Sequence, residues 1–448
     1  CSPVFPLDPA DMVAKMIPAK PKMTIKKAME ENPDLATQYK NNLTVKHLLD
    51  DAMLVEGIPV QTGVHAAGVI IADKPVSEYA PLLWNDEKNC WVIESDMVEC
   101  EKTLGLLKMD FLGLENLDIL NLALKYIKTT KKVAVHFHDI NKADDLNVIR
   151  DIYACGRTNG VFQFESDGIK KALTGFNPTS IDDVILMNAA YRPGPMDSIP
   201  EITEVKNGTE KPNYIIPQME QILGKTYGSA IYQEQIMQLF QLVGFSLGEA
   251  DVIRRAMSKK HLDEIEAAKD KFVSGMIEQG GKPADVEKFW IRLLAFASYA
   301  FNKSHAAAYS IVSYYTAFLK YYFPCEYLSA QLSYTPEKLK LFLSDLKYAG
   351  LTLLQPDINS GVPNFAPMPG NNKQIRFGIK AIKGVSAAAQ IIYDLRDTKK
   401  SNPNAHHLGP CKDYKDFIVR SIVYGVDMGV CTALVRAGAL DCLMQDGE

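Results

Sequence analysis

A lone acidic residue lies inside an apolar, strand-like run, the sequence GLLKMDFLGL at residues 105–114. With the two-residue period of a strand, Lys108 and Asp110 share one face about 7 Å apart, and apolar residues fill the other face. We expect this strand to be buried, where an ionised Asp110 needs a cation or a metal as partner. Two interpretations fit: a structural Lys108–Asp110 ion pair at a strand end, or a metal-ligating carboxylate with Lys108 beside it.

A dense group of basic residues occurs in ADVIRRAMSKKH at 250–261. Five of them fall within about two turns of a helix: Arg254, Arg255, Lys259, Lys260 and His261. Such a group can bind a triphosphate or a nucleic-acid backbone. The other interpretation is a solvated helix face on which Asp251 pairs with Arg255.

A second basic group stands at the start of a predicted long helix, in AFNKSHAAAYSIVSYYTAFLK at 300–320. Lys303, Ser304 and His305 occupy the first turn, where free backbone N–H groups and the helix dipole attract anions. Phosphate is the expected ligand. Alternatively, Ser304 caps the helix and His305 is an ordinary residue of its first turn.

Three further features carry weaker signals. The stiff loop YRPGPM at 191–196 presents Arg192 to a phosphate or a base, or to a structural ion pair. The segment TGVHAAGVI holds His65, which as a lone histidine is more often structural. His136 and His138 in HFHD would share a strand face, a weak indication of a metal site.

The segment IKAIKGVSAAA at 379–389 resembles a helix-hairpin-helix. In that motif a glycine-rich hairpin offers backbone N–H groups to a DNA phosphate without reading the base sequence. Lys383 and Gly384 form the candidate hairpin, and Ser386 stands where a second glycine is usual. VRAGALDCL at 435–443 is a fainter second copy.

These groups need elements that position them. Apolar periodicity predicts mostly helical structure, with short β-type runs at 62–114, which would form a mixed sheet carrying Asp110, and again after 352. Prolines 18, 21 and 33 are expected to separate the first helices. The expected helices are 23–31, 43–55, one beginning near 117, 231–243, 248–258, 261–279, 285–297 and 304–322.

Composition sets outer limits. A chain of 448 residues has room for about three domains, and its net charge of −5 leaves any nucleic-acid contact to local patches. No apolar run is long enough to span a membrane, and the eight cysteines include no Cys-x-x-Cys pair. We therefore expect a cytoplasmic protein with no membrane contact, no zinc site and no disulfide framework. The start of the chain at Cys1, without Met, suggests part of a longer protein.

Taken together, the motifs resemble the bacterial DNA polymerase III alpha subunits, the C family of replicative DNA polymerases. Ten of them occur in the family's order: IPAKPKMTIKKAM, TGVHAAGVIIA, GLLKMDFLGL, VFQFES, YRPGPMDSIPE, YGSAIYQEQIMQ, ADVIRRAMSKK, FNKSHAAAYS, QPDINSG and FGIKAIKGV. The resemblance implies an α+β, multi-domain and mostly helical protein, with a small nucleotidyltransferase-like palm sheet and a C-terminal helix-hairpin-helix region.

The resemblance also implies a domain layout. Residues 1–60 would be part of the thumb and 61–115 the second part of the palm, with Asp110 as a catalytic, magnesium-binding carboxylate and Lys108 as its companion. Residues 116–355 would be the fingers, and 356–448 the start of a duplex-binding region.

Residue roles follow from the same resemblance. The nucleotide-binding set would be Arg192, Arg254, Arg255, Lys303, Ser304 and His305, and the DNA-binding set Lys259, Lys260, Lys383 and Gly384. Implied partners are primer-template DNA, deoxynucleoside triphosphates and Mg²⁺, and, through regions outside this chain, the sliding clamp and other replicase subunits. The implied activity is template-directed DNA synthesis by two-metal phosphoryl transfer.

The chain departs from the family pattern in one respect. The family's other two catalytic carboxylates belong to an Asp-x-Asp motif upstream of the thumb, and this sequence contains no Asp-x-Asp. We therefore expect the chain alone not to extend a primer. Two alternatives stay open: a non-catalytic DNA-binding module, and an unrelated triphosphate-binding protein, which the lack of a G-x-x-x-x-G-K-[ST] loop disfavours.

Overall fold

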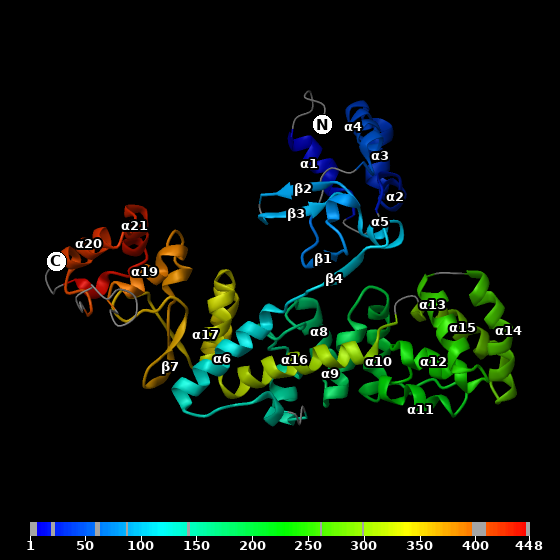
Figure 1. Cartoon of the computed structure of the whole chain (residues 1–448). Helices are drawn as coiled ribbons and strands as arrows, with labels where there is room; N and C mark the ends of the chain where they lie inside the picture. The colour runs from blue at the N-terminus through cyan, green and yellow to red at the C-terminus, as the bar shows by residue number, and fades with distance from the viewer. Residues whose placement is uncertain are drawn as a thin grey trace. The chain divides into compact units, whose positions relative to one another are not determined.

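The computed structural model of the chain describes residues 7–18, 23–58, 63–86, 88–140, 144–259, 262–297, 300–396 and 409–444. Its internal contacts divide the chain into two compact units, residues 1–113 and 114–448, each of which is described by itself. Helices dominate, with small sheets in both units (Figure 1). The predicted α+β, multi-domain class is confirmed. In the described part of the chain, no helix has the length and apolar character needed to cross a membrane.

The first unit opens with a small group of helices that pack around Leu35, Leu49 and Ala28. They are α1 (Leu7–Lys15), α2 (Ile25–Glu31), α3 (Pro33–Asn41) and α4 (Leu43–Val55). The predicted helices at 23–31 and 43–55 are present. The prediction that Pro33 only separates helices was incomplete, because Pro33 is the first residue of α3, where its missing N–H costs nothing, and Asn32 caps that helix.

Two antiparallel ladders follow, β1 with β4 and β2 with β3. Their elements are β1 (Gly68–Ile71), η1 (Val76–Glu78), β2 (Leu82–Asn85), β3 (Cys90–Ile93), α5 (Met97–Lys102) and β4 (Leu107–Asp110). The expectation of a mixed sheet around Asp110 was wrong, since β4 pairs antiparallel with β1; the mixed sheet of this chain lies at 352–376.

The expected burial of the strand that carries Asp110 was also wrong. Leu107 is 57% exposed, Met109 41% and Phe111 64%. The physical reason is that β1 and β4 form a sheet of only two strands in the described chain, with no second layer over the apolar face. An alternating sequence predicts a face suited to burial, but it does not supply the surface that covers it.

The second unit is built around the long helix α16 (Lys303–Tyr322), which packs along α9 (Ile181–Ala190). Ala306 and Ser310 are small enough for close approach, and the buried amide of Asn188 donates to the Ser310 hydroxyl at 3.1 Å. Ser313 and Tyr153 share a further buried hydrogen bond of 2.8 Å. Polar side chains along α16 are thus paired inside the core, which stabilises its position.

The remaining helices of this unit lie on both sides of α16 in the sequence. Those before it are α6 (Glu115–Lys131), η2 (Phe137–Ile140), α7 (Leu146–Val148), the π-helix η3 (Ile149–Ala154), α8 (Asp167–Phe176), η4 (Pro195–Ser198), α10 (Ile199–Lys206), α11 (Met219–Leu223), η5 (Gly224–Thr226), α12 (Gln233–Leu242), α13 (Leu247–Lys259), α14 (Leu262–Glu278) and α15 (Pro283–Ala297). Those directly after it are α17 (Pro324–Tyr334), η6 (Pro336–Lys338) and α18 (Leu339–Tyr348).

Helices α12 to α15 enclose a core of their own, in which Phe240, Phe272 and Trp290 make tilted and edge-on ring contacts. The predicted helices 231–243, 248–258, 261–279, 285–297 and 304–322 are all present, with ends that differ by at most two residues. The segment HFHD is a 3₁₀ turn, η2, so the predicted strand there was wrong. Among the described residues, no group of three or more His, Cys, Asp or Glu side chains is placed to hold a metal.

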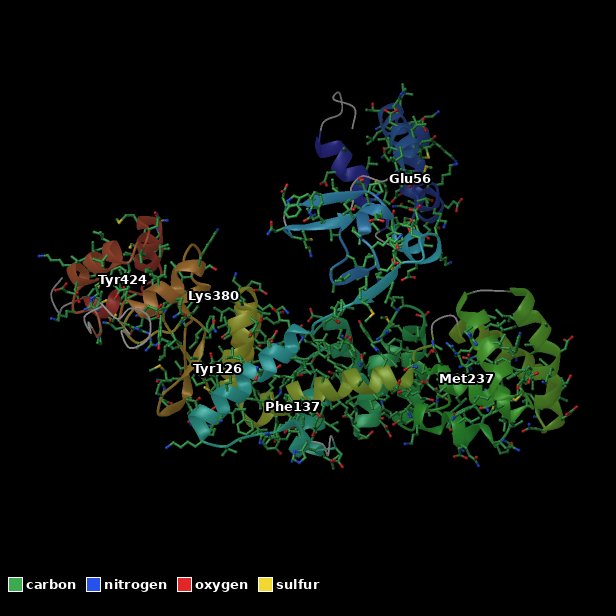
Figure 2. The ribbon with its side chains drawn as sticks, in the orientation of Figure 1. Glu56, Tyr126, Phe137, Met237, Lys380 and Tyr424 are labelled. Atoms are coloured by element: carbon green, nitrogen blue, oxygen red, sulfur yellow. The ribbon has the colours of Figure 1, made fainter. Side chains whose placement is uncertain are left out.

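The C-terminal part contains the three-stranded sheet β5–β7–β6 and a compact group of short helices. Its elements are β5 (Thr352–Leu354), β6 (Ala366–Met368), β7 (Asn371–Arg376), η7 (Ile379–Ala381), η8 (Ser386–Ala388), α19 (Ala389–Asp394), α20 (Tyr414–Val423), α21 (Met428–Arg436) and η9 (Asp441–Leu443). Tyr126 on α6, labelled in Figure 2, donates its hydroxyl to the Phe365 carbonyl at 2.7 Å. This bond links α6 to the sheet.

A buried ion pair joins α9 to α10. Lys206 lies 2.7 Å from Asp183, with side chains only 9% and 4% exposed, and Tyr227 and the Thr179 amide also donate to Asp183. Burial by itself raises the pKa of Asp183, but hydrogen bonds from Lys206, Thr179 and Tyr227 outweigh it and lower the pKa below its usual value.

Lys206→Met should therefore destabilise this part of the chain by about 3–5 kcal/mol at pH 7, because it leaves a buried carboxylate without its cation. Hydrogen exchange of the α9 and α10 amides measures this locally. The folded pKa of Asp183 is depressed below its unfolded value of about 3.9. The destabilisation caused by Lys206→Met should therefore reach its full size above that pH and shrink as the pH falls below it. The control is Lys225→Met, whose exposed pair with Asp182 should cost under about 1 kcal/mol; equal losses would contradict the prediction.

Candidate functional site

In the first unit, His65, Lys108 and Asp110 come together at the end of the β1–β4 ladder. Lys108 Nζ lies 2.8 Å from both carboxylate oxygens of Asp110, and His65 Nε2 lies 3.8 Å from Asp110 Oδ1. Asp110 is 42% exposed, whereas the Lys108 side chain is only 10% exposed. The hydrogen bond from Lys108 lowers the pKa of Asp110. An ionised, reachable carboxylate is thus held in one place.

Gly68 makes room for this arrangement. It stands opposite Asp110 in the ladder, and a Cβ there would meet His65 Nδ1 at 2.9 Å and Lys108 Cε at 3.1 Å. His65 Nδ1 accepts hydrogen bonds from the Ala67 and Gly68 amides at 3.2 and 2.7 Å, which fixes the ring beside the strand. The sequence favoured a structural role for His65, and the structure places it beside Asp110.

In the second unit, a short parallel bridge joins two segments that are far apart in the sequence. The Phe301 amide donates to the Ile231 carbonyl at 3.1 Å, and the Gln233 amide donates to the Phe301 carbonyl at 3.0 Å. Helices α12 and α16 both begin immediately after this bridge. Their N-termini therefore open side by side.

Cationic side chains converge on the bridge from three elements. The Arg192 guanidinium stacks on Phe301, 3.4 Å from the ring centroid, Lys303 Nζ lies over Tyr232 at 5.5 Å, and Arg254 donates to the Gln233 side chain at 3.2 Å. Burial lowers the pKa of Arg192 below its ordinary value. We call Arg192, Arg254 and Lys303 the bridge cations.

Carboxylates neutralise part of this charge. Glu234 accepts the Lys303 backbone amide with both carboxylate oxygens at 3.1 Å, so an anionic group already sits at the N-terminus of α16. Asp251 pairs with Arg254 at 2.8 Å and with Arg255 at 2.7 Å. The Asp251–Arg255 pair proposed from the sequence is thus present, and Arg255 is 58% exposed.

The other predicted residues are placed as follows. Asn302, and not Ser304, caps α16 by accepting the His305 amide at 3.0 Å, so the predicted cap was wrong. Ser304 and His305 are exposed, and the His305 ring stacks on Tyr309 and meets Phe301 edge-on. Lys259 ends α13 with its side chain outside the described residues, as is all of Lys260.

The candidate DNA-binding hairpin lies in the C-terminal part. Lys383 and Gly384 are exposed at a turn in which Gly384 has φ +90°, between the 3₁₀ turns η7 and η8. The fainter copy turns at Gly438, with φ +73°, after α21. A Cβ on Gly384 would lie 3.7 Å from that of Ala433, so the first hairpin packs against the helix of the second.

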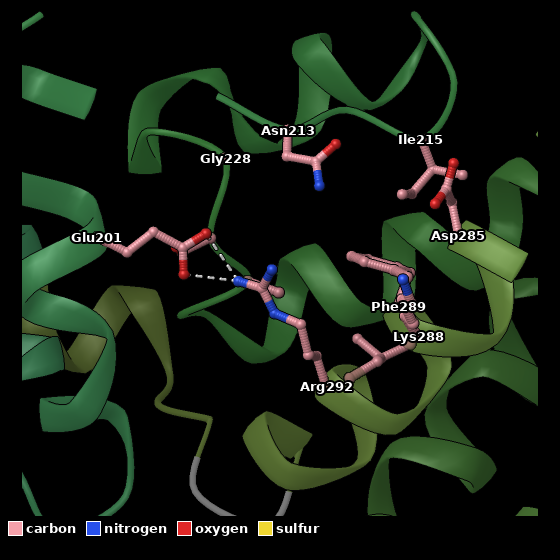
Figure 3. A pocket seen from close by; sticks show the side chains of 11 residues that line it. Glu201, Asn213, Ile215, Gly228, Asp285, Lys288, Phe289 and Arg292 are labelled. Atoms are coloured by element: carbon pink, nitrogen blue, oxygen red, sulfur yellow. Dashed lines mark hydrogen bonds and ion pairs between the residues drawn. The ribbon is translucent and has the colours of Figure 1, made fainter. Parts of the chain in front are cut away.

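A separate hollow lies between α10 and α15 (Figure 3). The Arg292 guanidinium reaches across it to Glu201 with contacts of 2.8 and 2.7 Å. Asn213, Asp285 and Lys288 also line it. None of the residues singled out from the sequence belongs to it.

Sequence reasoning missed Gln233 and Glu234, which hold Arg254 and the start of α16. Both lie inside the motif YGSAIYQEQIMQ at 227–238, to which the sequence analysis assigns no site residue. No periodicity could have found them, because their partners lie 21 and 69 residues away.

Comparison with known proteins agrees with the motif order. Residues 4–113 match the model of the bacterial DNA polymerase III alpha NTPase domain, 116–280 that of the bacterial DNA polymerase III alpha subunit finger domain, and 350–447 that of the helix-hairpin-helix motif.

Curated relatives named DNA polymerase III subunit alpha align over nearly the whole chain. Those of Thermus aquaticus, Aquifex aeolicus and Bacillus subtilis are 37%, 36% and 32% identical, each over 98% of this chain. The aligned part is 36%, 39% and 38% of their own length, so the chain spans well under half of each relative. The predicted resemblance is confirmed: the chain belongs to the family of bacterial DNA polymerase III alpha subunits.

Proposed function

We propose that this chain carries part of the nucleotidyl-transfer centre of a bacterial replicative DNA polymerase, which adds deoxynucleotides to a primer 3′ end under direction of a template. The observation that carries the proposal is the alignment of 98% of the chain with DNA polymerase III alpha subunits. The bridge cations support it, since they form a group suited to a triphosphate. We further propose that the chain is arranged as thumb, palm, fingers and duplex-binding region and that the protein is cytoplasmic.

Asp110 fits one ligand of a magnesium site. A carboxylate offers about four lone-pair positions, and those of Asp110 are only partly used by Lys108. Magnesium binds through one or two protein carboxylates together with phosphates and water. The bound ions would activate the primer 3′-hydroxyl and stabilise the leaving pyrophosphate. Lys108 keeps Asp110 ionised and in place, and the missing carboxylates would come from an Asp-x-Asp outside this sequence.

The bridge cations would hold the triphosphate of the incoming nucleotide. Arg192 is stacked and partly desolvated, so its charge acts in a region of reduced dielectric, where attraction to phosphate is stronger. The Lys303 N–H at the start of α16 would become available to the phosphate if Glu234 released it. Arg255, Ser304 and His305 would complete this set from more exposed positions.

Partners follow from the same proposal. Primer-template DNA would contact the Lys383–Gly384 hairpin through its phosphates, and the basic end of α13 with Lys259 and Lys260. The sliding clamp and other replicase subunits would bind through regions outside this chain.

Arg254→Gln should weaken binding of a magnesium-bound deoxynucleoside triphosphate at least about tenfold, since it removes a charge-assisted contact of about 1.5–3 kcal/mol. Glu234→Gln should strengthen binding a few fold, because the neutral amide competes less than the carboxylate with the triphosphate for the α16 N-terminus. Calorimetric titration of the purified chain measures both. Arg292→Gln and Glu220→Gln are controls that change the same charges away from the bridge, and the proposal fails if they shift binding equally.

The purified chain should not extend a primer, because it supplies one catalytic carboxylate and the chemistry needs more. The measurement is template-dependent incorporation in the presence of magnesium. Incorporation that disappears in Asp110→Ala would show that this expectation is wrong and that the chain contains a complete centre.

A non-catalytic duplex-binding module is the second candidate function, favoured by the helix-hairpin-helix match at 350–447. Gly384→Ala should then weaken duplex binding, because φ +90° is strained for alanine by about 1–2 kcal/mol and the hairpin amides would move. Gly370→Ala, in the β6–β7 turn at φ +77°, is the matched control. Fluorescence anisotropy at several salt concentrations measures binding, and equal effects of the two variants would remove the hairpin from the interface.

A further inference from the structure

A charged cavity lies at the opposite end of α16 from the bridge. Its volume is about 210 Å³, and Asp151, Arg157, Lys320, Asp345 and Tyr348 are among the residues that line it. Lys303 and Lys320 are 17 residues apart on one helix, so the cavity lies about 26 Å from the bridge cations along α16. It is therefore distinct from the proposed nucleotide site.

Lys320 holds the backbone segment that carries Arg157 in place. This lysine, 6% exposed, pairs with Asp345 at 2.6 Å and donates to the carbonyls of Arg157 and Asn159 at 2.8 Å each. Its three donors are thereby used. Lys320 holds the Arg157 segment in place and has no donor left for a ligand.

The residues before Arg157 also hold its backbone in place. The π-helix η3 ends at Ala154 and is followed by a turn at Gly156, which has φ +65°. Across this turn the Arg157 amide donates to the Ile152 carbonyl at 2.9 Å. A Cβ on Gly156 would lie 2.9 Å from Thr174 Oγ1. Single turns of π-helix occur frequently at functional sites.

The side chain of Arg157 is left without a hydrogen-bonding partner. Its guanidinium stacks on Tyr348 at 3.6 Å, while its Nε is buried and makes no hydrogen bond to any described residue. Buried donors are nearly always satisfied by protein or ordered water, so this atom leaves a place for a bound group or a water molecule. A guanidinium presents paired N–H groups that match the oxygens of phosphate or carboxylate.

The charges around the cavity leave a positive surplus. Asp345 is neutralised by Lys320, and Asp151 is bound by Arg150 through two hydrogen bonds of 2.7 and 3.1 Å. Arg157 forms no ion pair with a carboxylate of the described residues, although its charge, after the hydrogen bond from Arg150, helps to lower the pKa of Asp151. The volume is below the 300–1,000 Å³ typical of drug-sized sites, which favours a small anion.

We propose that this cavity binds a phosphoryl oxyanion through the Arg157 guanidinium, as a second anion site separate from the bridge cations. The oxyanion can be a free one, such as pyrophosphate, or a phosphate of a single DNA strand. Both have the same chemistry at Arg157. Tyr348 would hold the guanidinium flat while it binds.

The test is calorimetric titration of the purified chain with sodium pyrophosphate at constant ionic strength. Arg157→Met should abolish one class of binding site or weaken it at least about tenfold, while Arg254→Gln affects only the other class. Lys347→Met removes a positive charge from the same helix, α18, without lining the cavity, and should leave binding unchanged. If Arg157→Met and Lys347→Met bind pyrophosphate alike, the proposal is wrong.

Two further measurements keep the test decisive. Arg157→Lys keeps the charge without the paired donors, so it should bind with intermediate affinity even if the Met variant folds poorly; wild-type affinity in Arg157→Lys would overturn the guanidinium role. Competition by oligothymidylate for the Arg157-dependent site would identify a DNA phosphate as the ligand. The absence of competition would identify a free anion. The Arg157 site does not use the bridge cations. The proposal of a second anion site can therefore be disproved while the proposed function still holds.

Discussion

The second unit depends on the parallel bridge between Ile231–Gln233 and Phe301. Two backbone hydrogen bonds across a separation of about seventy residues set where α12 and α16 begin. Through it, Arg254 on α13, Arg192 on its proline-rich loop and Lys303 reach one region. Without the bridge these cations would belong to three unrelated surfaces. The arrangement is therefore set by backbone pairing, and the side chains take their positions from it.

Bringing cations together has an electrostatic cost, and the chain offsets it in two ways. Asp251 and Glu234 supply negative charge, and the rings of Phe301 and Tyr232 lie under Arg192 and Lys303. Cation–π contacts are weaker than ion pairs to phosphate. The cations are thus ordered by contacts weaker than those to phosphate, which is consistent with the nucleotide site proposed here.

The sequence predicted the helices well because their apolar period is local information. Motif order also singled out Arg192, Arg254 and Lys303, which the structure brings to the bridge, and Asp110, which lies beside Lys108. Their roles stay a prediction. It did not predict the exposure of Met109 and its neighbours, because the second layer over a strand is not encoded in that strand. Nor did it find Glu234 at the start of α16, since that contact depends on how two distant segments pair.

The two ends of α16 are held in different ways. At the N-terminus, Glu234 contacts the Lys303 amide from a half-buried side chain, which under the proposed function a phosphate would replace. Near the C-terminus, Lys320 is buried and bound to two carbonyls and Asp345, so its loss would remove the donor to both carbonyls and leave Asp345 without its cation. The anchored end therefore fixes the helix, and the replaceable contact at the other end can change while α16 stays in place. Under the proposed function, nucleotide binding at the bridge would then involve side-chain rearrangement around α16.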